Sequence, residues 1–181
     1  MDFKNYFQNY STSISNLLKE VDTNLINQSV ELINKIIKNN KKIYLVGNGG
    51  SSSIASHVSV DFAKVARVPS STFNNANLIT CFANDYDYEN WVTESIKAYC
   101  SDQDLLILIS SSGSSPNMIN AAHYCQKNNI DLITLSGFDK GNKLSTYGNV
   151  NFHVASNNYN YIEMTHHIIL VSLVDIYVDK T

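Results

Sequence analysis

Apolar residues recur at helical spacing through the first forty positions of the chain. The pattern predicts two helices between Phe3 and Asn39 that break near Asp22, where Asp and Thr side chains can cap the second helix. Its apolar anchors are Leu17, Leu18, Val21, Leu25, Ile26, Val30, Leu32, Ile33, Ile36 and Ile37. This apolar surface exceeds what one face of a sheet needs, so we expect residues 1–39 to bury part of it against another subunit.

Five short apolar runs then follow, and each reads as a strand that is buried on both faces. They cover residues 43–47, 78–82, 105–110, 131–136 and 150–155. Helical patterns lie between and after them, at about 52–66, 88–98, 116–128 and 161–179, with a short turn near Leu144. Strands that alternate with helices predict a single α/β domain over residues 1–181, a three-layer, doubly wound, five-stranded parallel sheet.

Two of the loops that follow strands are rich in small polar residues. The first is Gly47-Asn48-Gly49-Gly50-Ser51-Ser52-Ser53, and the second is Ser110-Ser111-Ser112-Gly113-Ser114-Ser115, before a helix that begins at Pro116. Glycines allow close approach of the backbone to an anion, and a helix start offers unpaired N–H groups. Each loop could be a tight, capped turn, but two of them in one sheet favour a phosphate site built from neutral donors.

The spacing of these loops differs from nucleotide-binding motifs. Neither loop matches the GxGxxG dinucleotide fingerprint, and the lysine of the GxxxxGK[ST] loop is missing. Neither carries an Asp or Glu suited to Mg²⁺ beside a phosphate. We therefore expect no nucleotide cofactor.

Composition narrows the class of protein further. A net charge of −3 without a Lys/Arg cluster argues against nucleic-acid binding. No apolar run is expected to reach the roughly 20 residues of a membrane helix, since Ser172 and Asp175 interrupt the longest one. The N-terminal residues lack a secretory pattern, which predicts a cytoplasmic protein. Cys81, Cys100 and Cys125 are widely spaced and odd in number, so they are expected to be buried apolar fillers, with a reactive thiol as the alternative.

The two loops together make the chain resemble a known family. A strand, GNGGSSS and a helix, followed by a strand, ISSSGSSPN and a helix, resemble the sugar isomerase (SIS) domain, which has a flavodoxin-like fold. His57, Asn84-Asp85 and SGFDKG before a final long helix make the chain most similar to the phosphoheptose isomerases, which convert sedoheptulose 7-phosphate to a heptose 7-phosphate. The resemblance implies a homotetramer with its active sites at subunit interfaces.

The resemblance also implies roles for individual residues. Asn48, Gly49, Gly50, Ser51, Asn84 and Asp85 would bind the sugar, and Ser110, Ser111, Ser112 and Ser115 would hold its phosphate. Some relatives bind Zn²⁺ through a histidine and a carboxylate one helical turn apart, plus residues of the last helix. His57 and Asp61 occupy the first pair.

The chain departs from the family pattern at three catalytic positions. Asp61 stands where the family has a glutamate base, Glu163 stands for a glutamine, and Val171 stands where a histidine is expected. His167 lies one turn before Val171 and on the same face as Glu163, so it could replace that histidine. His57, Asp61, Glu163 and His167 would then be a possible Zn²⁺ set. His166 is a rival, although it points about 100° away on an ideal helix.

Two functions therefore stay open. The first is an aldose–ketose isomerase, in which Asp61 or Glu163 acts as the base and His167 or His57 as the acid. The second, suggested by Val171, is a non-catalytic phosphosugar-binding or regulatory protein of the kind that acts on replication initiation.

Four further aromatic and histidine residues have no assigned role. His123 and His153 are expected to be surface or core residues, and Tyr159 and Tyr161 could either line the pocket mouth or pack in the protein interior.

Overall fold

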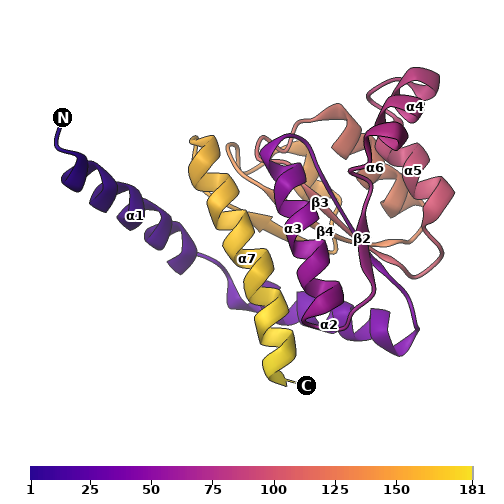
Figure 1. The fold of residues 1–181 in the computed structure, drawn as a ribbon, viewed down its shortest axis with the longest axis horizontal. Coiled ribbons are helices and arrows are strands. Elements are labelled where there is room, and N and C mark those ends of the chain that lie inside the picture. Colours follow the sequence, from indigo (N-terminus) through magenta and orange to yellow (C-terminus); the bar gives the residue numbers. More distant parts are fainter. Residues whose placement is uncertain (181) are drawn as a thin grey trace.

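A five-stranded parallel sheet organises the chain in the computed structural model, which describes residues 1–180 (Figure 1). The strands stand in the order β2-β1-β3-β4-β5. Their bounds are β1 Ile43–Gly47, β2 Ser70–Thr72, β3 Leu105–Ile109, β4 Asp131–Ser136 and β5 Val150–His153. This order is that of flavodoxin-like sheets, as the sequence predicts.

The register aligns the carboxyl ends of the central strands. Gly47 of β1 pairs with Ile109 of β3, and Ile109 pairs with Leu135 of β4. From β1 the chain passes first to β2 on one side and later to β3 on the other. The loops after β1 and β3 therefore diverge to opposite faces, and a crevice opens at this switch point of the topology.

Helices cover both faces of the sheet. One face packs against α2 (Thr23–Lys38), α3 (Gly50–Lys64) and α7 (Tyr159–Lys180), and the other against α4 (Ala76–Tyr86), α5 (Trp91–Tyr99), α6 (Pro116–Lys127) and the 3₁₀ turn η1 (Lys143–Thr146). Strand side chains alternate between the two cores, as Leu45 and Val46 do. Both are fully buried, which explains why the strands read as continuous apolar runs.

The two N-terminal helices break where the sequence predicts. α1 spans Phe3–Lys19, and Asp22 caps α2 by accepting a hydrogen bond from the backbone N–H of Asn24 at 2.8 Å. α1 extends away from the body and buries none of its residues (Figure 1). Leu17 packs against the core, but Phe3 and Phe7 are 75% and 70% exposed, so the apolar surface at the N-terminal end of α1 is uncovered within one chain.

The strand predicted at residues 78–82 is wrong, because this segment is part of helix α4. Asn75 caps the helix by accepting from the N–H groups of Asn77 and Leu78. Only Leu78, Ile79, Phe82 and Ala83 pack against the core, at the spacing of one helical face. The strand that the sequence missed is β2, a polar three-residue strand at the edge of the sheet, which an apolar pattern does not reveal.

The expectation about membrane helices also needs correction. Residues Tyr159–Asp179 of α7 are long and apolar enough to cross a membrane by length and composition, with a mean hydropathy of 1.3. Packing within the protein accounts for this composition. Ile162, Leu170 and Leu173 are fully buried in the core between α7, α3 and the sheet.

His166 is fully buried on α7, where its Nε2 lies 3.0 Å from the carbonyl oxygen of Ser136. This bond makes Nε2 the protonated nitrogen, because a carbonyl oxygen only accepts. Its Nδ1 is buried without a partner. Burial lowers the pKa of His166 to about 4, so the side chain is neutral at pH 7.

We expect His166 to make folding sensitive to acid. Unfolded His166 takes up a proton below its ordinary pKa of 6.5, whereas folded His166 resists until about pH 4, so stability is lost as pH falls through this window. Urea unfolding at pH 7 and pH 4.5 should show roughly 2 to 3 kcal/mol more loss for the wild type than for His166→Gln. Equal losses in the two proteins would contradict the assignment.

Candidate functional site

A small hollow of about 140 Å³ lies at the switch point between β1 and β3. We call it the serine hollow. It is lined by Asn48, Ser51, Ile109, Ser110, Ser111, Ser112, Ser115, Tyr159 and Glu163. Both loops singled out by the sequence contribute to it, together with the first turns of α7. The volume is about that of four or five water molecules, which suits a phosphate group.

The helices that start at the serine hollow lack side-chain caps. The N-cap residues of α3 and α6 are Gly49 and Ser115, and the side chain of neither accepts a hydrogen bond from its helix. By contrast, Asp2, Asp22 and Asn75 cap α1, α2 and α4. Free N–H groups and the positive ends of two helix dipoles therefore face the same crevice, an arrangement that favours an anion.

The serine hydroxyls add neutral donors to these backbone groups. Ser110 and Ser115 hydrogen bond to each other through their Oγ atoms at 3.2 Å. Ser111 is 6% exposed, and its Oγ is buried without any partner. A buried hydroxyl without a partner costs free energy, and a ligand oxygen in the hollow would remove that cost.

Asn48 fastens the first loop to the helix that follows the second. Its side-chain amide exchanges two hydrogen bonds with Asn117 of α6, both at 3.0 Å, and Asn117 is almost fully buried. The Tyr88 hydroxyl donates to Asn48 Oδ1 at 3.3 Å. The two loops are thus held at a fixed separation.

Glu163 brings a carboxylate to this otherwise neutral hollow. It lies on α7 against the backbone of Gly50, so closely that a Cβ atom at position 50 would collide with its carboxylate. The absence of a side chain at Gly50 is thus what lets Glu163 approach the start of α3.

Asp61, His57 and His167 form a chain of contacts between α3 and α7. His57 Nδ1 lies 2.8 Å from His167 Nε2, and His57 Nε2 lies 3.2 Å from Asp61 Oδ2. If Asp61 accepts from His57 Nε2–H, the neutral His57 ring accepts at Nδ1 and His167 donates. Burial, and next the neighbouring His57, lower the pKa of His167, while Asp61 opposes the shift.

The predicted Zn²⁺ ligands do not converge in this arrangement. His57 turns opposite ring nitrogens toward Asp61 and His167, and one ring offers one nitrogen to a given ion. Within residues 1–180, no three His, Cys, Asp or Glu side chains are grouped so that they could hold a metal. As placed, these residues do not fit a single ion.

Other predicted site residues do not line the serine hollow. Asn84 and Asp85 are exposed near the end of α4 and hydrogen bond to each other at 2.9 Å. Gly49 is exposed and adopts a φ of 54°, which favours glycine. Val171 packs, partly buried, against the core.

The sequence is similar to that of known proteins. The SIS domain family matches residues 5–137. The chain is 34% identical over 148 residues to a phosphoheptose isomerase of Thermodesulfovibrio yellowstonii, a match that covers 78% of this chain and 73% of that protein. It is 36% identical over 140 residues to phosphoheptose isomerase 2 of Campylobacter jejuni, covering 70% and 68%. The chain belongs to the SIS domain family.

Solved structures agree on the fold of this SIS domain. A phosphoheptose isomerase from Neisseria gonorrhoeae superimposes with a TM-score of 0.87 at 21% identity, and covers 98% of this chain and 99% of that one. One from Francisella tularensis gives 0.86 at 22% identity, with 98% and 96% covered. These two likenesses concern the fold.

Sequence reasoning missed two residues that shape the serine hollow of this SIS domain. Asn117 and Tyr88 fix Asn48, and nothing in their local sequence distinguishes them from other polar helix or loop residues. Of the two tyrosines left open, Tyr159 lines the hollow. Tyr161 packs on Tyr10 of α1, with ring centroids 4.8 Å apart.

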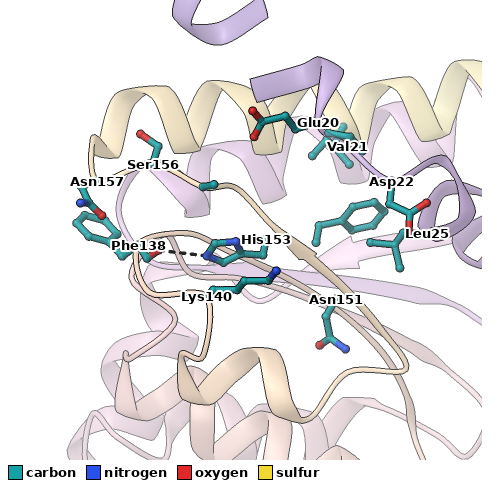
Figure 2. A pocket seen from close by; sticks show the side chains of 13 residues that line it. Glu20, Val21, Asp22, Leu25, Phe138, Lys140, Asn151, His153, Ser156 and Asn157 are labelled. Carbon is teal, nitrogen blue, oxygen red and sulfur yellow. Dashed lines mark hydrogen bonds between the residues drawn. The ribbon is translucent and has the colours of Figure 1, made fainter. Parts of the chain in front are cut away.

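A larger hollow of about 730 Å³ lies at the corner between α1 and α2 (Figure 2). Glu20 and Asp22 face Lys140 and His153 across it, and His153 is hydrogen bonded to the carbonyl oxygen of Phe138 at 3.2 Å. It shares no lining residue with the serine hollow. Its lining contains no serine-rich helix start, unlike that of the serine hollow.

We expect Gly50→Ala to displace the Glu163 carboxylate from the SIS-domain site while changing stability little, because a flexible side chain can move aside. Turnover should fall by about tenfold or more, measured at saturating substrate. Gly141→Ala is the matched control, since a Cβ there meets nothing within 4 Å. Unchanged turnover in Gly50→Ala would show that the placement of Glu163 is unimportant.

Proposed function

We propose that this chain is an aldose–ketose isomerase that acts on a phosphorylated sugar and interconverts sedoheptulose 7-phosphate and a heptose 7-phosphate. One observation carries the proposal, namely that phosphate-type donors and a carboxylate line the same hollow. The phosphoheptose isomerases among its relatives support the same reaction class.

In this proposal the serine hollow holds the phosphate. The hydroxyls of Ser110, Ser111, Ser112 and Ser115 and the uncapped N–H groups of α3 and α6 donate to its oxygens. These donors are neutral, so the binding energy comes from hydrogen bonds and helix dipoles. The phosphate holds one end of the sugar and limits where its carbonyl end can lie.

The reaction then needs a base and an acid near the first two carbons. Glu163 removes the proton from C1 of the ketose, while an acid protonates the C2 carbonyl oxygen, which gives an enediol. Return of the proton to C2 and loss of the O1 proton complete the aldose. We assign the base to Glu163 rather than Asp61, because Asp61 faces His57 and does not line the hollow.

The His57 and His167 pair supplies the acid in this proposal. His167 is four residues beyond Glu163, on the same face of α7. Its lowered pKa keeps the ring neutral at pH 7, and its one N–H, which His57 accepts in this structure, passes to the C2 carbonyl oxygen and is regained from the O1 hydroxyl. Asp61 holds the other end of the pair and fixes the tautomer of His57.

We test the reaction by following exchange of the C1 and C2 protons of sedoheptulose 7-phosphate by NMR, with and without a chelator. Glu163→Gln should retain binding and lose about 10²- to 10⁴-fold in turnover.

Ser111→Ala should weaken sugar-phosphate binding by about tenfold or more, with stability unchanged or higher, because it removes a buried unpartnered hydroxyl.

Ser29→Ala is the matched control for Ser111→Ala. Ser29 is also fully buried, but its hydroxyl donates to the carbonyl oxygen of Leu25, away from the site. It should lose stability and keep its binding. Binding without proton exchange in the wild type would exclude the isomerase and support the regulatory function suggested by Val171.

We further propose that the chain assembles as a homotetramer through α1. The support is the uncovered apolar surface of that helix, where Phe3, Tyr6 and Phe7 are all more than half exposed. Light scattering should give about 81 kDa, four copies of a 20.2 kDa chain. A mass of about 20 kDa at micromolar concentration would contradict the assembly.

A further inference from the structure

The end of β4 and the segment that follows it hold the backbone of the serine-rich loop 110–115. Ser110 N–H donates to the carbonyl oxygen of Leu135 at 3.0 Å, and Gly137 N–H donates to that of Ser111 at 2.8 Å. Leu144 N–H donates to the carbonyl oxygen of Gly113 at 3.0 Å. These bonds fix the loop backbone, while its hydroxyls face the hollow.

Asn142 lies at the centre of this support. It is 8% exposed, and its Nδ2 donates to Ser136 Oγ at 3.0 Å and to the carbonyl oxygen of Asp139 at 2.9 Å. Its Oδ1 accepts from Ser145 N–H at 3.1 Å, which caps η1. Both ends of the amide are therefore committed, and the side chain has one orientation.

Gly113 rests directly against this fixed amide. Its φ is 61°, and a Cβ atom on Gly113 would collide with Oδ1 and Cγ of Asn142. The loop can thus approach β4 this closely only because Gly113 has no side chain and Asn142 cannot turn away. Asn142 is not among the residues that line the serine hollow.

From this geometry we infer that Asn142 is a positioning residue, which sets the serine loop at the spacing that a phosphate needs. The inference rests on the proposed function. Asn142 acts through Gly113 and η1, without touching the ligand. The segment after β4 thereby determines how tightly the sugar phosphate is held. It does not act on the proton transfer at the other end of the sugar.

Asn142→Asp tests this inference with little change in size. It replaces the Nδ2 donor with an oxygen that faces the Gly137 and Asp139 carbonyl oxygens, so the loop should loosen. We expect the Kd for inorganic phosphate and the KM for sedoheptulose 7-phosphate to rise on the order of tenfold, with kcat changed by less than about threefold. Asn142→Ser is the milder variant if the aspartate protein does not fold.

Asn151→Ala is the matched control. Asn151 also ties β5 to β4, by accepting from Thr134 Oγ1 at 2.6 Å and from Gly148 N–H at 3.1 Å, but it contacts no part of the serine loop. It should lower the melting temperature and leave KM unchanged. Equal shifts of KM in the Asn142 and Asn151 variants would reduce the role of Asn142 to general stability and overturn the inference.

A double-mutant cycle tests the contact itself. Gly113→Ala should raise KM more in the wild type than in Asn142→Ala, which removes the collisions with Oδ1 and Cγ and leaves only that with the Cβ of residue 142. Additive effects would overturn the inference, as would a wild-type KM in Asn142→Asp. If the wild type binds neither phosphate nor the sugar phosphate, the proposed function falls, and this inference falls with it.

Discussion

The parallel pairing of β1 with β3 is the constraint on which the rest of the structure depends. Because Gly47 and Ile109 pair in register, the two loops that follow them leave the sheet side by side. Their helices pass to opposite faces, so the starts of α3 and α6 converge on one point without competing for space. The donors at this point come from backbone and hydroxyl groups.

Successive turns of the helix α7 contribute residues to the proposed site. Tyr159 and Glu163, on its first turns, line the hollow, while His167 meets His57 one turn further on. α3 and α7 lie alongside each other (Figure 1), so each turn of α7 faces a different part of α3. His166 fixes α7 to the end of β4 through Ser136, and Ser136 Oγ accepts from Asn142. The segment after β4 thus contacts both the helix that carries Glu163 and the loop that carries the serines.

The sequence predicts those strands and loops whose local residue pattern is distinctive. Residues 43–47, 105–109 and 132–136 are buried strand residues in an α/β fold, and their apolar runs show it. Glycine and serine at strand ends are similarly visible. Leu78–Phe82 misleads because a buried helix face and a buried strand look alike over five residues, and the Asn75 cap decides between them. Contacts such as those of Asn117 and Asn142 join segments far apart in the chain, or depend on the tertiary position of Gly113, and no local pattern encodes them.

A crystal structure of the protein with sedoheptulose 7-phosphate tests the central claim most directly. We expect phosphate oxygens in the serine hollow, with Ser111 Oγ hydrogen bonded to one of them and the Glu163 carboxylate beside C1 and C2. A phosphate bound instead beside Lys140 and His153, with Ser111 Oγ still unpartnered, would contradict it.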